Sequence, residues 1–157
     1  MNRDSINWLG PMPAVTTPFN ADKSIDEESF VANVGRLFDA GATGMVGAGC
    51  TGEFWALSLQ ERQNLARLAV QACDGRGPII IGAASIREQE VVEQIIAAKE
   101  VGADAALVLP PYFAKVTDAE VIGHFEVIAD QSELPVVLYN IPGNAGNAIT
   151  PDIADRL

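Results

Sequence analysis

Basic residues are scarce in this chain of 157 residues. Ten lysines and arginines stand against 21 aspartates and glutamates, which gives a formal net charge of −11 at pH 7. Nucleic acids and anionic lipid surfaces attract basic proteins, so this balance argues against both as partners. It does not argue against a small anionic substrate, because such a molecule responds to local hydrogen-bond donors more than to the total charge.

Cysteine, histidine and long apolar runs are also scarce. Two cysteines, Cys50 and Cys73, do not make a disulfide framework, and we expect reduced thiols in a cytoplasmic protein. The only histidine, His124, falls in the middle of a helical pattern, where a packing or surface role is expected. No cluster has metal-ligand spacing, so neither a metal nor another cofactor is predicted. No apolar run is long enough to cross a membrane, and the first eight residues lack the apolar region of a secretory signal.

Apolar runs and helical patterns alternate along the whole chain. Strands are predicted at 13–19, 44–48, 78–82, 105–109 and 136–140, at a period of roughly 30 residues. Capping boxes at Ser58–Glu61, Ser85–Glu88 and Thr117–Glu120 are predicted to open three of the intervening helices, and Thr150–Pro151 opens the last. Strict alternation of uniformly apolar strands with helices indicates a parallel α/β sheet.

Two architectures fit this pattern. A doubly wound sheet would be complete with five strands, whereas a (β/α)8 TIM barrel needs about 250 residues. The last helical pattern is cut short at Leu157, which favours the barrel. We therefore expect residues 1–157 to form the N-terminal portion of a single (β/α)8 barrel domain. Its first five βα units would be present, and its sixth to eighth units and C-terminal helices absent.

Ligands of both architectures bind at the carboxyl ends of the strands. There the sequence places a Gly-rich stretch, Val46–Phe54, which follows a strand and precedes a helix. Such a turn can expose N–H groups to an anion, or it can be only a tight corner. Its glycines fit neither the dinucleotide-binding nor the Walker pattern. Tyr139 ends the fifth predicted strand, either as a general acid/base or as a packed core tyrosine.

Four motifs resemble the dihydrodipicolinate synthase / N-acetylneuraminate lyase family of class I aldolases. Gly49–Glu53 reads Gly-Cys-Thr-Gly-Glu, and Tyr139–Pro142 reads Tyr-Asn-Ile-Pro. Thr17-Pro-Phe19 and Pro110-Pro-Tyr-Phe113 follow the first and fourth predicted strands, as in the family. The resemblance covers nearly the whole chain. It implies a (β/α)8 barrel in which a lysine forms a Schiff base with pyruvate or a related 2-oxo acid.

The resemblance also implies roles for individual residues. Thr51 and Gly52 would bind the substrate carboxylate, and Tyr139 would donate and accept protons. Cys50 stands at the first hydroxyl position of the signature, where the family usually relays protons through Thr or Ser. The Schiff-base lysine would stand on the sixth strand, about 30 residues beyond Tyr139. The chain itself is expected to be inactive, because its lysines fall in predicted loops (Lys23 and Lys115) and in a helix (Lys99).

Two further departures bear on the substrate. Phe113 stands where the synthases carry a relay tyrosine supplied across a dimer, and Asn144 stands where they carry an arginine for the second substrate. Together with Cys50, these favour a lyase or dehydratase acting on a 2-keto-3-deoxy sugar acid or a related 2-oxo acid. Dihydrodipicolinate synthase proper, and a non-catalytic 2-oxo-acid-binding relative or pseudoenzyme, remain alternatives. The family implies a homo-oligomer, a dimer or a tetramer, for the full-length protein.

Overall fold

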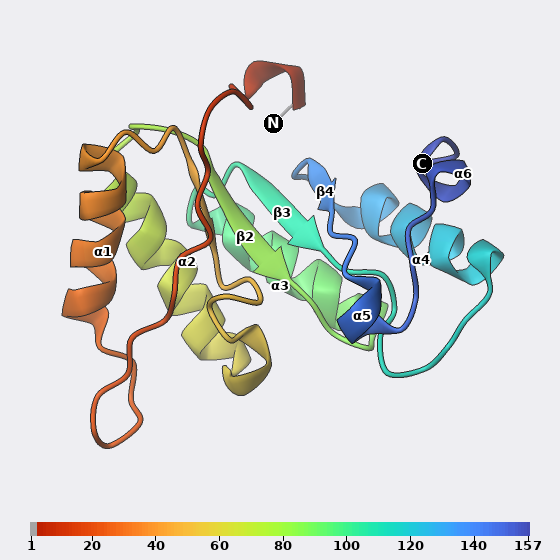
Figure 1. Cartoon of the computed structure of the whole chain (residues 1–157), viewed down its shortest axis with the longest axis horizontal. Helices are drawn as coiled ribbons and strands as arrows, with labels where there is room; N and C mark the ends of the chain where they lie inside the picture. Colours follow the sequence, from red (N-terminus) through yellow and green to blue (C-terminus); the bar gives the residue numbers. More distant parts are fainter. Residues whose placement is uncertain (1–2) are drawn as a thin grey trace.

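A computed structural model describes residues 3–157 of the chain. Four short parallel strands alternate with longer helices (Figure 1). In chain order the elements are η1 (Arg3–Ser5), α1 (Glu27–Asp39), β1 (Met45–Gly47), η2 (Phe54–Ala56), α2 (Leu59–Cys73), β2 (Ile79–Ala83), α3 (Glu88–Glu100), β3 (Ala105–Val108), α4 (Asp118–Gln131), β4 (Val136–Leu138), α5 (Pro142–Ala145) and α6 (Pro151–Ala154).

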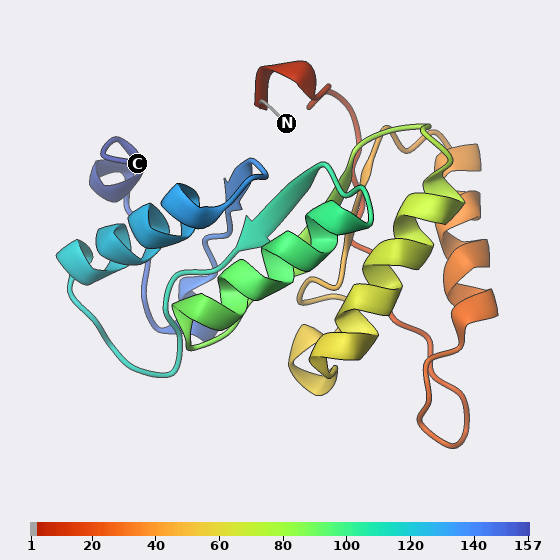
Figure 2. The ribbon, with the colours of Figure 1, turned by 180° about the vertical axis from the view of Figure 1, so that it is seen from behind.

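The four strands pair in chain order, β1-β2-β3-β4, and every pairing is parallel. Helices α2, α3 and α4 lie on one side of this sheet, as the views from the front and from behind show (Figures 1 and 2). The strands and helices therefore form successive βα units, as the alternation in the sequence predicts. This is the arrangement of the N-terminal part of a (β/α)8 barrel.

The first predicted strand, 13–19, is wrong as a regular strand. The segment runs parallel to β1, but Ala14 alone bridges that strand, at Val46, while Phe19 forms an antiparallel bridge with Ile25. The N–H of Val15 donates to the carbonyl of Val46 at 2.9 Å, and the N–H of Val46 donates to Pro13 at 2.9 Å. Prolines at positions 11, 13 and 18 lack the N–H group that a strand ladder needs, so pairing stops after one bridge.

The two faces of the sheet carry different apolar clusters, because neighbouring residues of a strand point to opposite sides. Ile79, Ile81 and Ala106 belong to the main core, between the sheet and its helices. Ile80 and Ala105 belong to a smaller cluster on the other face, which Ile6 of the N-terminal segment joins. All five residues of β2 are buried, as expected for a strand inside a parallel sheet.

Two of the three predicted capping boxes are confirmed. Ser58 and Glu61 open α2, and Thr117 and Glu120 open α4, each with reciprocal side-chain and backbone hydrogen bonds. The cap at Thr150 is also present, with its side chain accepting from the N–H of Ile153.

The predicted capping box of Ser85 and Glu88 is wrong. Helix α3 begins at Glu88 itself, and Arg87 stands at its cap without a side-chain hydrogen bond. The Ser85 hydroxyl instead donates to the carboxylate of Glu90, two residues further along the first turn of the helix. Ser85 therefore belongs to the loop after β2 rather than to the start of α3.

His124 packs inside the fold. It is 2% exposed, and its Nε2 lies 3.1 Å from the carbonyl oxygen of Leu109, at the end of β3. Its Nδ1 lies 3.4 Å from Glu88 at the start of α3. Burial lowers the pKa of His124 below its ordinary value. The packing role predicted for this residue is confirmed, and it ties α4 to α3 and β3.

Candidate active site

Residues from four successive strand ends meet in one cluster. Phe54, Ala84 and Leu109 are buried at its centre, and each follows a different strand. Four partly buried side chains pack against them: Cys50, Tyr112, Tyr139 and Ile141. The structure thus brings Cys50 and Tyr139, which are 89 positions apart in the sequence, to the same place at the carboxyl ends of the strands.

Cys50 and Tyr139 pack in the same cluster, and the thiol affects the phenol. Burial is the main cause that raises the pKa of the Tyr139 phenol above its ordinary value, and a hydrogen bond with the Cys50 side chain raises it further. A phenol with a raised pKa keeps its proton at neutral pH. Tyr139 therefore carries its proton at neutral pH, with Cys50 as its neighbour in the cluster.

The Gly-rich turn after β1 is held by bonds to its main chain. The Thr17 hydroxyl, which is buried, donates to the carbonyl of Gly52 at 2.7 Å. Within the turn, the N–H of Glu53 donates to Cys50 at 3.0 Å, and the N–H of Phe54 to Gly49 at 3.3 Å. A Cβ at Gly52 would lie 3.1 Å from the carbonyl oxygen of Val15, so a larger residue would crowd the backbone there.

Two non-glycine residues of the turn have left-handed backbone conformations. Ala48 has φ of 50° and Glu53 has φ of 56°. Such conformations cost of order 1–3 kcal/mol each and persist only where the surroundings impose them. Thr51 lies between them with an exposed side chain, and Gly52 is buried. Thr51, for which the resemblance implies carboxylate binding, is thus exposed in the turn that carries Cys50 and Phe54 into the cluster.

Two polar side chains behind the cluster were not predicted. Arg62 of α2 donates at 2.8 Å both to the carbonyl of Ala84 and to the side chain of Gln94. Gln94 of α3 is 9% exposed and accepts the N–H of Ala84 at 3.1 Å. Both side chains belong to amphipathic helices in which polar residues ordinarily face solvent, so periodicity gives no signal for them.

Asn147 is a third polar residue that the sequence did not reveal. It is 7% exposed, and its amide donates to the carbonyls of Pro111 and Ala114 at 2.6 and 2.8 Å. Its side-chain oxygen accepts the N–H of Val116 at 3.1 Å. Asn147 thus fixes the loop that follows β3, from which Tyr112 reaches the cluster.

Phe113 and Asn144 lie apart from the cluster. Phe113 is 92% exposed and has φ of 76°, so its ring projects into solvent directly after Tyr112. Asn144 is exposed on α5. Both positions are therefore open to a ligand or a neighbouring chain.

None of the three lysines of the chain enters the cluster. Lys23 stands in a turn at φ of 74°, and Lys115 is exposed in the loop after β3. Lys99, in α3, makes an ion pair with Glu133. The placement in loops and a helix follows the prediction, and no lysine stands beside Tyr139.

Within residues 3–157, no group of three or more His, Cys, Asp or Glu side chains is arranged to hold a metal ion. None of the helices described combines the length and the hydropathy needed to cross a membrane.

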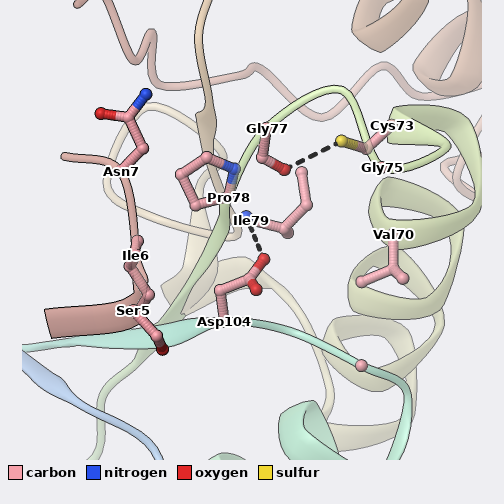
Figure 3. Close-up of a pocket in the computed structure, with 11 residues that line it drawn as sticks. Ser5, Ile6, Asn7, Val70, Cys73, Gly75, Gly77, Pro78, Ile79 and Asp104 are labelled. Carbon is pink, nitrogen blue, oxygen red and sulfur yellow. Dashed lines mark hydrogen bonds between the residues drawn. The ribbon is translucent and has the colours of Figure 1, made fainter. Parts of the chain in front are cut away.

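A cavity of about 350 Å3 lies at the opposite, amino-terminal end of the strands (Figure 3). Its polar groups bond within the fold: Asp104 accepts the N–H of Ile79 at 2.8 Å, and the Cys73 thiol donates to the carbonyl of Gly77 at 3.1 Å. The second cysteine therefore lies far from Cys50 along the strand direction, and this cavity is separate from the Cys50–Tyr139 cluster.

Comparison with known proteins decides the family. The model of the dihydrodipicolinate synthetase family matches residues 7–157. The chain belongs to this family. Its membership accounts for the four motifs and for the position of the cluster at the carboxyl ends of the strands.

Among curated members of the dihydrodipicolinate synthetase family, the 4-hydroxy-tetrahydrodipicolinate synthase of Methanopyrus kandleri is 41% identical over 149 residues. That match covers 94% of this chain and 50% of that protein. The putative 2-dehydro-3-deoxy-D-gluconate aldolase YagE of Escherichia coli K12 is 38% identical, over 96% of this chain and 50% of its own. The chain spans about half the length of the curated relatives it matches.

Solved structures of the family have the same fold. The dihydrodipicolinate synthase of Acinetobacter baumannii, solved in complex with pyruvate, superposes with a TM-score of 0.92 at 36% identity and covers 94% of this chain and 51% of that one. YagE, also solved with pyruvate, gives a TM-score of 0.89 at 37% identity, over 95% of this chain and 51% of that one. The βα units of this chain are therefore those of the family's TIM barrel.

Proposed function

We propose that this chain provides the carboxylate-binding and proton-transfer part of a pyruvate-type Schiff-base lyase, which makes or breaks a C–C or C–O bond next to a 2-oxo acid. The observation that carries the proposal is the meeting of Cys50, Tyr139 and the Gly-rich turn at the carboxyl ends of the strands. Two relatives with the same fold were solved with pyruvate, the simplest 2-oxo acid.

The proposed chemistry begins with the carboxylate of the substrate. Thr51, exposed in the turn, would offer its hydroxyl and main-chain N–H, and Gly52 beside it is the second residue proposed to bind the carboxylate. A lysine amine supplied by a following strand attacks the keto carbon. Loss of water gives a protonated imine, which withdraws electrons from the bond that breaks. Breaking that bond leaves an enamine, which takes a proton at carbon and becomes an iminium again; in the reverse direction the iminium loses that proton to give the enamine.

Tyr139 is the proposed donor and acceptor of those protons. Its phenol is protonated at neutral pH and lies beside Cys50. A thiol is a weak donor and a weak acceptor, so the relay through Cys50 is weaker than one through a hydroxyl. The 157-residue chain lacks a lysine in the cluster and is proposed to be inactive by itself.

The decisive experiment uses the gene that encodes the chain. We expect the reading frame to continue past Leu157 and to encode a lysine at the end of an apolar strand about 30 residues after Tyr139. Pyruvate and borohydride should then fix a covalent adduct, visible by mass spectrometry, on that lysine of the longer product. The 157-residue chain is the matched control and should give no adduct. Failure of the longer product to form an adduct with any 2-oxo acid would favour a non-catalytic binding protein.

The substrate separates two candidate activities. Cys50, Phe113 and Asn144 favour a lyase or dehydratase of 2-keto-3-deoxy sugar acids, and one relative carries an aldolase name of that kind. The synthase proper is the second candidate, because most of the similar curated relatives carry its name. Turnover of a 2-keto-3-deoxy sugar acid without formation of 4-hydroxy-tetrahydrodipicolinate supports the first candidate; the opposite result supports the second.

A further inference from the structure

We propose that Arg62 and Gln94 are positioning residues that clamp the loops after β1 and β2 together and so fix the Gly-rich turn against the rest of the cluster. The catalytic consequence rests on the proposed function, but the clamp itself is a property of this fold. Neither side chain reaches Cys50 or Tyr139 directly. They act indirectly, through the main chain of the two loops and through the ring of Phe54 at the centre of the cluster.

Arg62 joins two strand ends. Its Nε donates to the carbonyl of Leu57, just past the Gly-rich turn, at 3.3 Å. One of its terminal nitrogens donates to the carbonyl of Ala84, directly after β2, at 2.8 Å. Its guanidinium also lies over the ring of Phe54, 5.4 Å from the centroid, at the centre of the cluster. A planar, forked cation can reach all three at once, whereas an ammonium group cannot.

Gln94 completes the clamp from α3. Its side-chain oxygen accepts both the N–H of Ala84, at 3.1 Å, and the Arg62 guanidinium, at 2.8 Å. Its amide donates to the carbonyl of Ala84 at 3.4 Å. The main chain of Ala84 is thus held on both sides by side chains, at the point where the β2 ladder has ended.

The clamp stabilises a turn whose backbone is strained. Ala48 and Glu53 are held in left-handed conformations, and these persist only where contacts over-determine them. Thr17 holds the turn at Gly52, before Phe54, and Arg62 holds it at Phe54 and Leu57. Loss of Arg62 therefore frees the half of the turn that follows Glu53.

Amide hydrogen exchange measured residue by residue tests the clamp on the 157-residue chain. The Phe54, Leu57 and Ala84 N–H groups are bonded in the structure, to Gly49, Phe54 and Gln94 respectively. We expect Arg62→Met and Arg62→Lys to speed exchange at Phe54 and Leu57, and Gln94→Leu to speed it at Ala84, by about tenfold, as for loss of a bond to a charged or buried group. Arg67→Met is the matched control, because Arg67 lies on the same helix and, among residues 3–157, its side chain bonds to Asn64 and Gln71 of that helix and not to the strand ends.

A titration of Tyr112 gives a second readout that simple loosening would not produce. Burial raises the pKa of Tyr112, and the charge of Arg62 offsets part of that rise, while Glu90 adds to it. The chain has two tyrosines, so in a Tyr139→Phe background the phenolate absorbance reports Tyr112 alone. Arg62→Met should raise the Tyr112 pKa further, and Arg62→Lys, which keeps the charge, should leave it near that of the parent.

The outcomes are distinct. Faster exchange with Arg62→Lys, at an unchanged Tyr112 pKa, supports the forked clamp. Unchanged exchange in Arg62→Lys and Gln94→Leu overturns it, as does an equal effect of Arg67→Met. If Arg62→Met fails to fold, Arg62→Lys and Gln94→Leu still decide. In the longer gene product, Arg62→Lys should raise KM for the 2-oxo acid while borohydride still traps the adduct. If the unsubstituted longer product gives no adduct, the proposed function fails, but the clamp does not.

Discussion

At the scale of single residues, the distinguishing feature of the site is a thiol beside a phenol. Cys50 occupies a position at which the family usually carries a hydroxyl, and its side chain contributes to the raised pKa of Tyr139. A titration followed by phenolate absorbance, in a Tyr112→Phe background, should show Tyr139 titrating above the ordinary tyrosine pKa of about 10. Cys50→Ala should lower that pKa, because burial alone then raises it.

Cys73→Ala is the control for this titration, because Cys73 lies at the other end of the strands against Gly77. It should leave the Tyr139 pKa unchanged. If Cys50→Ala also left it unchanged, the thiol and the phenol would not interact in solution, and the relay assigned to Cys50 would have no physical basis.

Both tyrosines also predict how stability depends on pH. Their folded-state pKa values are raised, chiefly by burial, so the folded chain holds the phenol protons more tightly than the unfolded chain does. The resulting stability is fully present below the unfolded pKa of about 10 and is lost as pH rises through the folded values. Urea unfolding should show a free energy of unfolding that falls between about pH 9 and about pH 11. The fall should be shallower in Tyr112→Phe; an equal fall in that variant would contradict the prediction.

At the scale of elements, a glycine in β2 allows the main chain that follows β1 to approach it closely. A Cβ at Gly82 in β2 would fall well inside van der Waals distance of the main-chain carbonyl of Ala48. Neither backbone can move without breaking the parallel pairing, so Gly82→Ala should lower the free energy of unfolding by about 3 kcal/mol, as overpacking does. Urea denaturation measures this.

Gly123→Ala is the matched control for that substitution. Gly123 lies inside α4, where a Cβ would meet nothing within 4 Å. Because alanine favours helix over glycine, this variant should gain roughly 0.5–1 kcal/mol. If both variants lost the same free energy of unfolding, the close approach of Gly82 to Ala48 would not be the reason that glycine is needed at position 82.

Elements whose signals are local were predictable from the sequence, and those that depend on distant contacts were not. The caps at Ser58, Thr117 and Thr150 involve only residues three apart, and all three are present. The box at Ser85 has the same local pattern, but the serine hydroxyl bonds Glu90 instead. The local sequence therefore does not distinguish the box at Ser85, which does not form, from those at Ser58 and Thr117, which do.

The site divides in the same way. The placement of Cys50 and Tyr139 together followed from their position at strand ends, although their roles stay predictions. Arg62, Gln94 and Asn147 could not be found, because a polar residue on an amphipathic helix or in a loop looks like any solvated one. Arg62 and Gln94 meet only once helices α2 and α3 pack against each other, and Asn147 is buried only where it meets the loop after β3.

At the scale of the whole molecule, the sheet is open. Among residues 3–157, β4 has a strand neighbour only on the β3 side, and its three residues are only half-buried, whereas those of β2 are fully buried. The chain exposes 8266 Å2, where a typical monomer of its mass, 16.6 kDa, exposes about 7600 Å2. The excess approaches the roughly 800 Å2 that each partner buries in an ordinary stable interface.

We therefore expect the 157-residue chain to self-associate through the free edge of β4. Light scattering coupled to size-exclusion chromatography should give a mass above 16.6 kDa that falls on dilution. Val137→Lys, which places a charge on the face of β4 away from the helices, should shift the chain toward the monomer. A parent chain that is monomeric at all concentrations and unfolds in one cooperative transition would contradict the expectation.

In the Gly-rich turn, the groups that fix the backbone are different from the side chain proposed to relay protons. The bonds that shape it, from Thr17 to Gly52 and from Glu53 and Phe54 back to Cys50 and Gly49, all end on main-chain atoms of the turn. The side chain at position 50 can therefore be exchanged without redrawing the backbone around it. Because a serine codon is one nucleotide away from either cysteine codon, a lineage that carries this turn can switch between thiol and hydroxyl chemistry in one mutational step and keep its fold.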